Sequence, residues 1–216
     1  MMIRREESIL DGRRFRMLGG LPLLFFIARV IEYTRVGTPS QVLWLCHLAN
    51  LFLAIGLLAG QAAVIRISVL YVIFGIPPWA VDMWFIKIVT PVSVFSHLGG
   101  LAVGIFAISK VRMRSGLWPL ALLVFILLQI LCRLFTPPDL NINTAHRVYG
   151  LWTNIVSVYW QYWVISTLVV AANLWLIEFA LRMLFPPDAE GISNASSASS
   201  ASSASSVDGA IARDRG

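Results

Sequence analysis

The stretch QVLWLCHLANLFLAIGLLAG, residues 41–60, decides the fold, because no Asp, Glu, Lys or Arg interrupts its twenty positions. A helix of about 20 predominantly apolar residues crosses the ~30 Å hydrocarbon core of a bilayer. The run is therefore long enough for one transmembrane helix. Similar apolar runs lie before and after it.

The composition of the whole chain agrees with a lipid environment. Of 216 residues, 58% are apolar and only 13% are charged, whereas a soluble domain is about 45–50% apolar and about 25% charged. The net charge of +6 comes largely from Lys and Arg in short loops and at the N-terminus, which is the placement that sets membrane topology. We expect membrane lipids as partners and no nucleic-acid role.

Six apolar segments are long enough to be spans. The third carries Gly75, Pro77 and Pro78, and a double proline stops or kinks a helix. An aromatic piece at 151–160 is expected to be interfacial or re-entrant. The six predicted spans are 17–33, 41–60, 64–84, 88–108, 117–135 and 162–185. The fold class expected is all-α, a polytopic transmembrane helix bundle.

Three regions follow from this division. Residues 1–16 form an Arg-rich cytoplasmic segment, residues 17–185 the six-helix domain, and residues 186–216 a Ser/Ala-rich tail. A tail of this composition cannot bury enough apolar surface to fold. The Lys/Arg distribution predicts that both termini are cytoplasmic. We expect a multi-pass protein, with the bacterial plasma membrane as its location.

Cys46 and His97 are the candidate catalytic residues. The second and fourth spans both enter from the outer face, and at ~1.5 Å per residue the two side chains differ in depth by roughly 6 Å. A thiol beside an imidazole is the minimum for a thiolate nucleophile. Equally, a buried Cys can serve as a small apolar residue, and the His can bond a neighbouring helix.

Other polar groups in the spans have structural as well as functional explanations. Asn50 shares the helix face of Cys46 and with Ser96 could border a polar cavity. His47 points about 100° away from Cys46, so it is poorly placed to activate that thiol; we expect it to face the first span near Glu32 or to line a polar pocket. Arg29 and Glu32, three residues apart, can pair. The remaining span charges Arg66, Asp82 and Glu178 lie near span ends and are expected to snorkel or pair.

The outer loop TPPDLNINTAHRVYG, residues 136–150, supplies further substrate-binding candidates. It could cover the cavity or bind a headgroup phosphate. It could equally be a solvated loop that caps the next helix. Its candidate residues are Asn141, Asn143, His146 and Arg147. The two cysteines lie in separate spans, so no disulfide is expected. Three histidines in the chain are too few to predict a metal site, and no cofactor is expected.

The order of several motifs resembles the YwaF-like integral membrane family. These motifs are LWLCHLANLFLAIGLL from Leu43, Arg66 followed by VLYVIFGIP, VFSHLGG at 94–100, and the Asn-bearing outer loop. The resemblance implies six or so helices, and it matches the family Cys to Cys46 and the family His to His97. Position 47 departs from the family, which commonly has an acidic residue there. Relatives include a phospholipid acyltransferase, and more distantly the androgen-induced hydrolases with a Thr/His pair.

Two functions are therefore carried forward. The first is an acyltransferase or hydrolase that acts on lipid esters through the Cys46/His97 pair, with Asn50 or a loop Asn at the oxyanion. The second is a non-catalytic membrane protein: a small-solute carrier, a lipid binder or an assembly partner. The broken third span is typical of transporter binding sites, but the two halves of the chain show no internal repeat. The oligomeric state does not follow from the sequence.

Overall fold

The computed structural model describes residues 2–86 and 90–186, which are helical with short connections. Nearly all of the tail predicted to be disordered lies outside these residues. In chain order the elements are α1 (Met2–Asp11), α2 (Arg13–Met17), α3 (Gly20–Arg35), η1 (Pro39–Leu43), α4 (Leu45–Ala59), α5 (Ala62–Phe74), α6 (Ile76–Ile86), α7 (Pro91–Val94), η2 (Phe95–Gly99), α8 (Gly100–Val111), α9 (Trp118–Phe135), η3 (Pro138–Leu140), η4 (Ile142–Thr144), η5 (Gly150–Trp152) and α10 (Tyr159–Leu184). The prediction of an all-α fold is confirmed.

Four helical segments among the described residues are long and apolar enough to cross a membrane. They are Ala62–Phe85, Pro91–Val111, Trp118–Phe135 and Tyr159–Leu184. The helices α3 and α4 have 16 and 15 residues, fewer than the about 20 that a span needs. Four of the six predicted spans are thus present by length and composition, and the first two are not confirmed.

The third apolar segment is interrupted where the sequence indicates. Helix α5 ends at Phe74, and Gly75 leads directly into α6. Pro77 and Pro78 occupy the first turn of α6, where a missing backbone N–H costs no intrahelical hydrogen bond. The two prolines therefore start a second helix, and α5 and α6 still form one apolar run of 24 residues.

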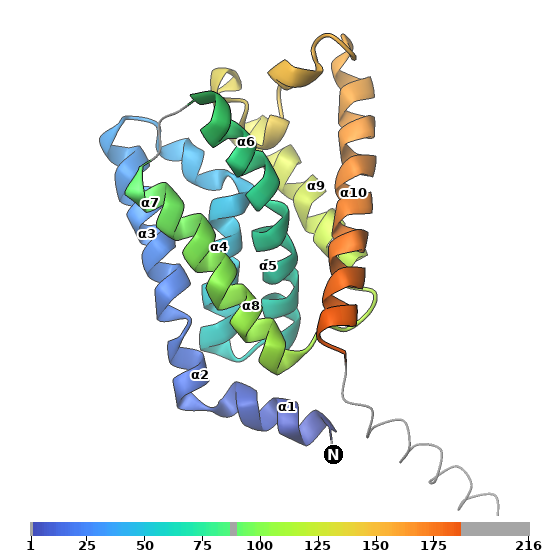
Figure 1. Cartoon of the computed structure of the whole chain (residues 1–216). Coiled ribbons are helices and arrows are strands. Elements are labelled where there is room, and N and C mark those ends of the chain that lie inside the picture. Colours follow the sequence, from blue (N-terminus) through green and yellow to red (C-terminus); the bar gives the residue numbers. More distant parts are fainter. Residues whose placement is uncertain (1, 87–89, 187–216) are drawn as a thin grey trace, which may run out of the picture.

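Helices α4 and α5 form the centre of the bundle (Figure 1). Helix α3 packs on α4, α8 packs on α5, and α9 packs on α10. The most deeply buried side chains include Leu53 and Leu57 of α4, Ile65 and Tyr71 of α5, and Ile108 of α8. Large apolar side chains such as Leu168 and Leu184 of α10 are more than half exposed, as expected for a surface that faces lipid.

Two acidic residues tie the ends of the helices together. The carboxylate of Glu6 in α1 pairs with Arg66 at 2.8 Å and with Arg114 at 2.7 Å. The carboxylate of buried Glu178 accepts three backbone N–H groups at the start of α9, each at 2.8 Å. These first N–H groups of a helix lack intrahelical partners, and an anion there interacts favourably with the positive end of the helix dipole. Arg66 and Glu178 thus each have a partner near a helix end, as expected: Arg66 pairs with Glu6, and Glu178 binds the backbone at the start of α9.

The segment before the last helix differs from the prediction. The sequence predicts an interfacial or re-entrant piece at 151–160, whereas the structure has the short 3₁₀ turn η5 followed by connecting residues up to Val158. Helix α10 then begins at Tyr159 and continues for 26 residues. The aromatic residues that suggested an interfacial piece belong largely to the first turns of α10, so this helix begins three residues earlier than the predicted sixth span.

Candidate functional site

Cys46 lies in the first turn of α4, where the outer loop holds the backbone in place. The amide of Asn143 donates to the carbonyl of Leu43 at 2.8 Å, and its oxygen accepts the N–H of Leu45 at 2.9 Å. The corner between α5 and α6 packs closely against Cys46. A Cβ on Gly75 would lie 3.0 Å from the Cβ of Cys46, so only glycine allows this approach without displacing the cysteine.

His97 lies in a π-helical turn, Phe95–Gly99, between α7 and α8. A π turn accommodates one extra residue in the helix, and such turns are frequent at functional sites. Here the consecutive residues Ser96 and His97 are both buried, at 1% and 6% exposure, whereas Phe95 before them is 65% exposed. The turn therefore aims two neighbouring polar side chains into the bundle.

The hydrogen-bond partner of His97 fixes its tautomer. Its Nδ1 lies 2.9 Å from the carbonyl oxygen of Ser93, which only accepts, so Nδ1 carries the hydrogen. Its Nε2 is then a bare lone pair, buried and without a protein partner among the described residues. Trp79 of α6 stacks on the ring at 4.7 Å between centroids and donates its Nε1 hydrogen to the hydroxyl of Ser93 at 3.0 Å.

His47 faces α3, as the sequence indicates, and its ring also reaches the thiol of Cys46. Its Nε2 lies 3.2 Å from Nη2 of Arg29 and 3.1 Å from the hydroxyl of Tyr33. A guanidinium only donates, so Nε2 accepts and the hydrogen is on Nδ1. That Nδ1 lies 3.7 Å from Sγ of Cys46. The two side chains leave the helix about 100° apart around its axis. Nδ1 of His47 still reaches Sγ of Cys46, because Nδ1 is the ring nitrogen nearest the backbone.

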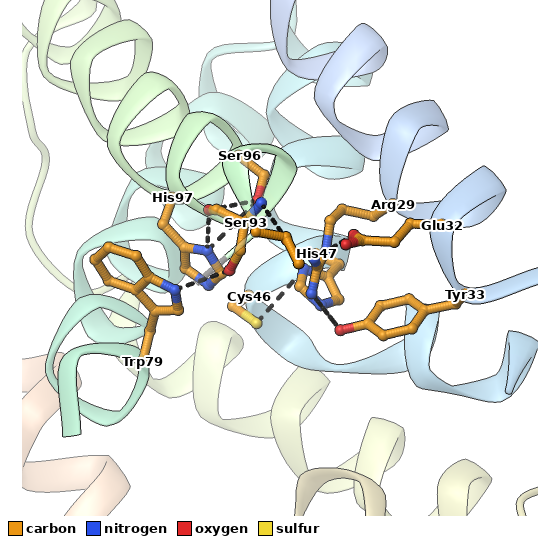
Figure 2. A network of polar contacts seen from close by, with 10 residues as sticks. Arg29, Glu32, Tyr33, Cys46, His47, Trp79, Ser93, Ser96 and His97 are labelled. Atoms are coloured by element: carbon orange, nitrogen blue, oxygen red, sulfur yellow. Dashed lines mark hydrogen bonds and ion pairs between the residues drawn. The ribbon is translucent and has the colours of Figure 1, made fainter. Parts of the chain in front are cut away.

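These three side chains converge. Sγ of Cys46 and one ring nitrogen each of His47 and His97 all lie within 4.8 Å of one another. Figure 2 shows the sulfur of Cys46 between the two imidazole rings in this view, with Trp79 beyond His97. Cys46 and His97, chosen from the sequence for their similar depth, therefore come together, with His47 as an unforeseen third member.

A charged network of α3 lies on the far side of His47 (Figure 2). The predicted pair of Arg29 and Glu32 is confirmed, at 2.5 Å, and Arg29 also donates to the hydroxyl of Tyr33. Glu32 faces outward as well, because it lines a groove of about 470 Å³ on the surface. The groove is lined by Ala28, Ile31, Glu32, Arg35, Val36 and Val92.

Asn50 joins the two halves of the site. Its amide nitrogen donates to the backbone carbonyls of Cys46 at 3.2 Å and of Ser96 at 3.1 Å. Both amide hydrogens are thereby used, so Asn50 has none left for an oxyanion. Ser96 is similarly engaged, because its hydroxyl donates to the carbonyl of Ser93 at 3.0 Å. Both residues position the site rather than offer a donor to a substrate.

Of the four outer-loop candidates, three bind mainly their own loop and Asn143 binds outside it. Asn141 accepts the backbone N–H groups of His146 and Arg147, both at 3.0 Å. His146 lies 3.3 Å from the hydroxyl of Thr136, and Arg147 donates to the carbonyl of Asp139 at 2.8 Å. Both donors of Asn143 are also used, on Leu43 and Cys132. Only Asn143 touches the helix that carries Cys46.

Sequence reasoning missed Trp79 and Ser93. Ser93 precedes His97 by four residues, so helical spacing would have placed its carbonyl under the imidazole. No sequence signal announces the stacking of Trp79, because it depends on how α6 turns after Gly75. No known protein family, curated protein or solved structure matches the chain. The chemistry of the site is therefore argued from its own geometry.

Proposed function

We propose that this chain is a membrane acyltransferase or hydrolase that cleaves lipid esters with Cys46 as nucleophile and His97 as general base. The observation that supports it is the buried, unpartnered Nε2 of His97 in a cluster whose ligand atoms lie within 4.8 Å of Sγ of Cys46. A nucleophile, a base within reach and a third group that orients the base are the requirements of such a site. Here the carbonyl of Ser93 orients the base.

The reaction would proceed in two balanced halves. His97 Nε2 takes the thiol proton while Sγ bonds to the ester carbonyl carbon, and the carbon–oxygen bond of the ester then breaks. The leaving alcohol takes the proton from His97, and the acyl group stays on Cys46 as a thioester. Water or a second alcohol gives its proton to His97 and attacks the thioester carbon, and Sγ leaves and regains a proton.

The surrounding residues assist the charged stage of this reaction. His47 directs Nδ1–H at the sulfur from 3.7 Å, so it is a donor to the thiolate rather than a base. Trp79 lies flat against His97 at 4.7 Å, and an aromatic face favours the cationic imidazolium. Both contacts reduce the cost of forming charge on Cys46 and His97 during the reaction.

The location of the groove supports a lipid substrate. It opens on α3 beside α7, and its wall is apolar except for Glu32 and Arg35. An acyl chain fits an apolar wall, and a zwitterionic or polar headgroup fits adjacent charges of opposite sign. The residues that line the groove do not include Cys46 or His97. Its link to the site is Glu32, which pairs with Arg29, which contacts His47.

We also propose that α3 and α4 cross the membrane with their flanking turns, which gives six passes and two cytoplasmic termini. In support, α1, α2 and the end of α10 lie at the same end of the bundle (Figure 1). Membership of the YwaF-like family, and with it a bacterial plasma membrane location, belongs to the same proposal.

The test is acyl-enzyme formation in vesicles of phosphatidylcholine with a labelled acyl chain. We expect a hydroxylamine-sensitive mass increase on Cys46, which is absent in Cys46→Ser, and a turnover about 10²–10⁴-fold lower in His97→Gln, the usual contribution of a general base. The matched control is Cys132→Ser, which changes the chain's other cysteine and should leave the label in place. An acyl label or a lipid product that survives Cys46→Ser would disprove the nucleophile.

A further inference from the structure

The geometry points to a metal site: we propose that Cys46, His47 and His97 bind one borderline or soft transition-metal ion, of which Zn²⁺ is the reference. This inference goes beyond the acyl chemistry, because binding needs only the three ligand atoms and no lipid. It names a second ligand for the same cluster.

The ligand types and spacing favour such an ion. Thiolate and imidazole are the preferred ligands of Zn²⁺, with Zn–S near 2.3 Å and Zn–N near 2.0–2.1 Å, so tetrahedral binding separates sulfur and nitrogen by about 3.5 Å. Sγ of Cys46 and Nδ1 of His47 are 3.7 Å apart. The whole triad lies within 4.8 Å, so a shift of about 1 Å at the longest separation completes the geometry.

The orphaned nitrogen of His97 is the independent observation. His97 is 6% exposed, and its Nε2 has no hydrogen-bond partner within residues 2–86 and 90–186. A buried acceptor without a partner costs about 1–3 kcal/mol, and an ion at that lone pair removes this cost. The other nitrogen already donates to a backbone carbonyl, which is the outer-shell contact that metal-binding histidines usually have.

His47 can serve as the third ligand through Nδ1. Its Nε2 must then carry the hydrogen, and the hydroxyl of Tyr33 at 3.1 Å is the acceptor for it. Arg29, which donates to Nε2 in the metal-free arrangement, keeps its bonds to Glu32 and Tyr33. The thiolate and Glu32 carry two negative charges, which balance part of the positive charge of the ion and Arg29.

The part of the chain that the structure describes supplies three ligands, which leaves a fourth position open. Catalytic zinc sites have this form, with water or substrate in the fourth position, whereas structural sites are closed by four ligands. A bound ion also occupies the lone pair of His97 and the thiolate. Under the acyl mechanism proposed above, the ion would therefore inhibit acylation of Cys46.

The experiment uses the full chain in detergent, with Zn²⁺ or Co²⁺ alone as the probe and no lipid. We expect one ion per chain and a thiolate-to-cobalt absorption band that disappears in Cys46→Ser. His47→Ala and His97→Ala should each weaken Zn²⁺ binding by at least about 10–100-fold, and Tyr33→Phe by about the same factor as an outer-shell change. His146→Ala, the chain's third histidine, is the matched control and should bind normally.

Each result decides the matter. Absence of stoichiometric binding, or a cobalt spectrum unchanged in Cys46→Ser, overturns the metal site. Loss of binding in His146→Ala places the ion elsewhere and overturns it too. Metal binding without acylation of the chelator-treated protein supports this inference and refutes the proposed acyl chemistry. Acylation without metal binding does the reverse.

Discussion

Replacing Asn50 by leucine removes the hydrogen bonds that join the helix of Cys46 to the turn of His97, with little change in side-chain size. Asn50 is 3% exposed and donates two bonds, to Cys46 and Ser96. Each buried hydrogen bond is worth about 0.5–1.5 kcal/mol net. We therefore expect Asn50→Leu to lower the free energy of unfolding by about 1–3 kcal/mol.

Thermal unfolding in detergent measures this loss. For a chain of this size, 1 kcal/mol corresponds to about 2–4 °C, so the midpoint should fall by roughly 2–12 °C. Asn173→Leu is the matched control, because Asn173 makes the same kind of bond to a carbonyl four residues earlier but is exposed on α10. Alkylation of Cys46 should change only in Asn50→Leu. Equal midpoints for the two variants would show that Asn50 does not hold the site together.

Three further outcomes are expected. Trp79→Leu should slow alkylation of Cys46 several-fold, because His97 loses its stacked ring; an unchanged rate would remove Trp79 from the site. Glu178→Gln should cost about 1.5–3 kcal/mol in unfolding experiments, since a charge-assisted helix cap is lost; an unaltered midpoint would contradict this. Burial and a hydrogen bond to Asp82 raise the pKa of Tyr149 to about 12. Between pH 10 and 11, Tyr149→Phe should therefore leave the phenolate absorbance of the folded protein unchanged; a lost phenolate signal would refute the raised pKa.

The long helices and the pair of Cys46 and His97 could be predicted from patterns in the sequence. Apolar runs bounded by charges predicted the four long segments, and Gly75 with two prolines predicted the break after α5. Cys46 and His97 were expected at similar depths from the same ends of their predicted spans. Because the rise per residue of a helix is constant, this similarity predicted that the two side chains could approach. Depth alone was enough to pair side chains 51 positions apart.

Rotation about the helix axis did not follow from the sequence. The π turn at Phe95–Gly99 shifts the helix phase by one residue, and no composition signal marks such a turn. The reach of His47 depends on which ring nitrogen Arg29 engages, which is a tertiary contact. The outer-loop asparagines were expected to meet a substrate, but both adopt left-handed backbone conformations and use their side chains within the protein. The amide of Asn141 bonds to nearby loop backbone, and that of Asn143 bonds to Leu43, Leu45 and Cys132. These are properties of side-chain partners rather than of hydropathy.

The bond between Asn143 and Leu45 has a consequence for how the protein is made. The two residues are separated by 98 positions, so α4 leaves the ribosome long before its first N–H group can find this partner. Only after the outer loop emerges behind α9 does the turn that carries Cys46 acquire its final anchor. A chain interrupted before residue 143 would contain the cysteine and both nearby histidines, yet the backbone beneath them would lack that anchor. Maturation of the site is in this sense a late step of biosynthesis, although its residues are made early.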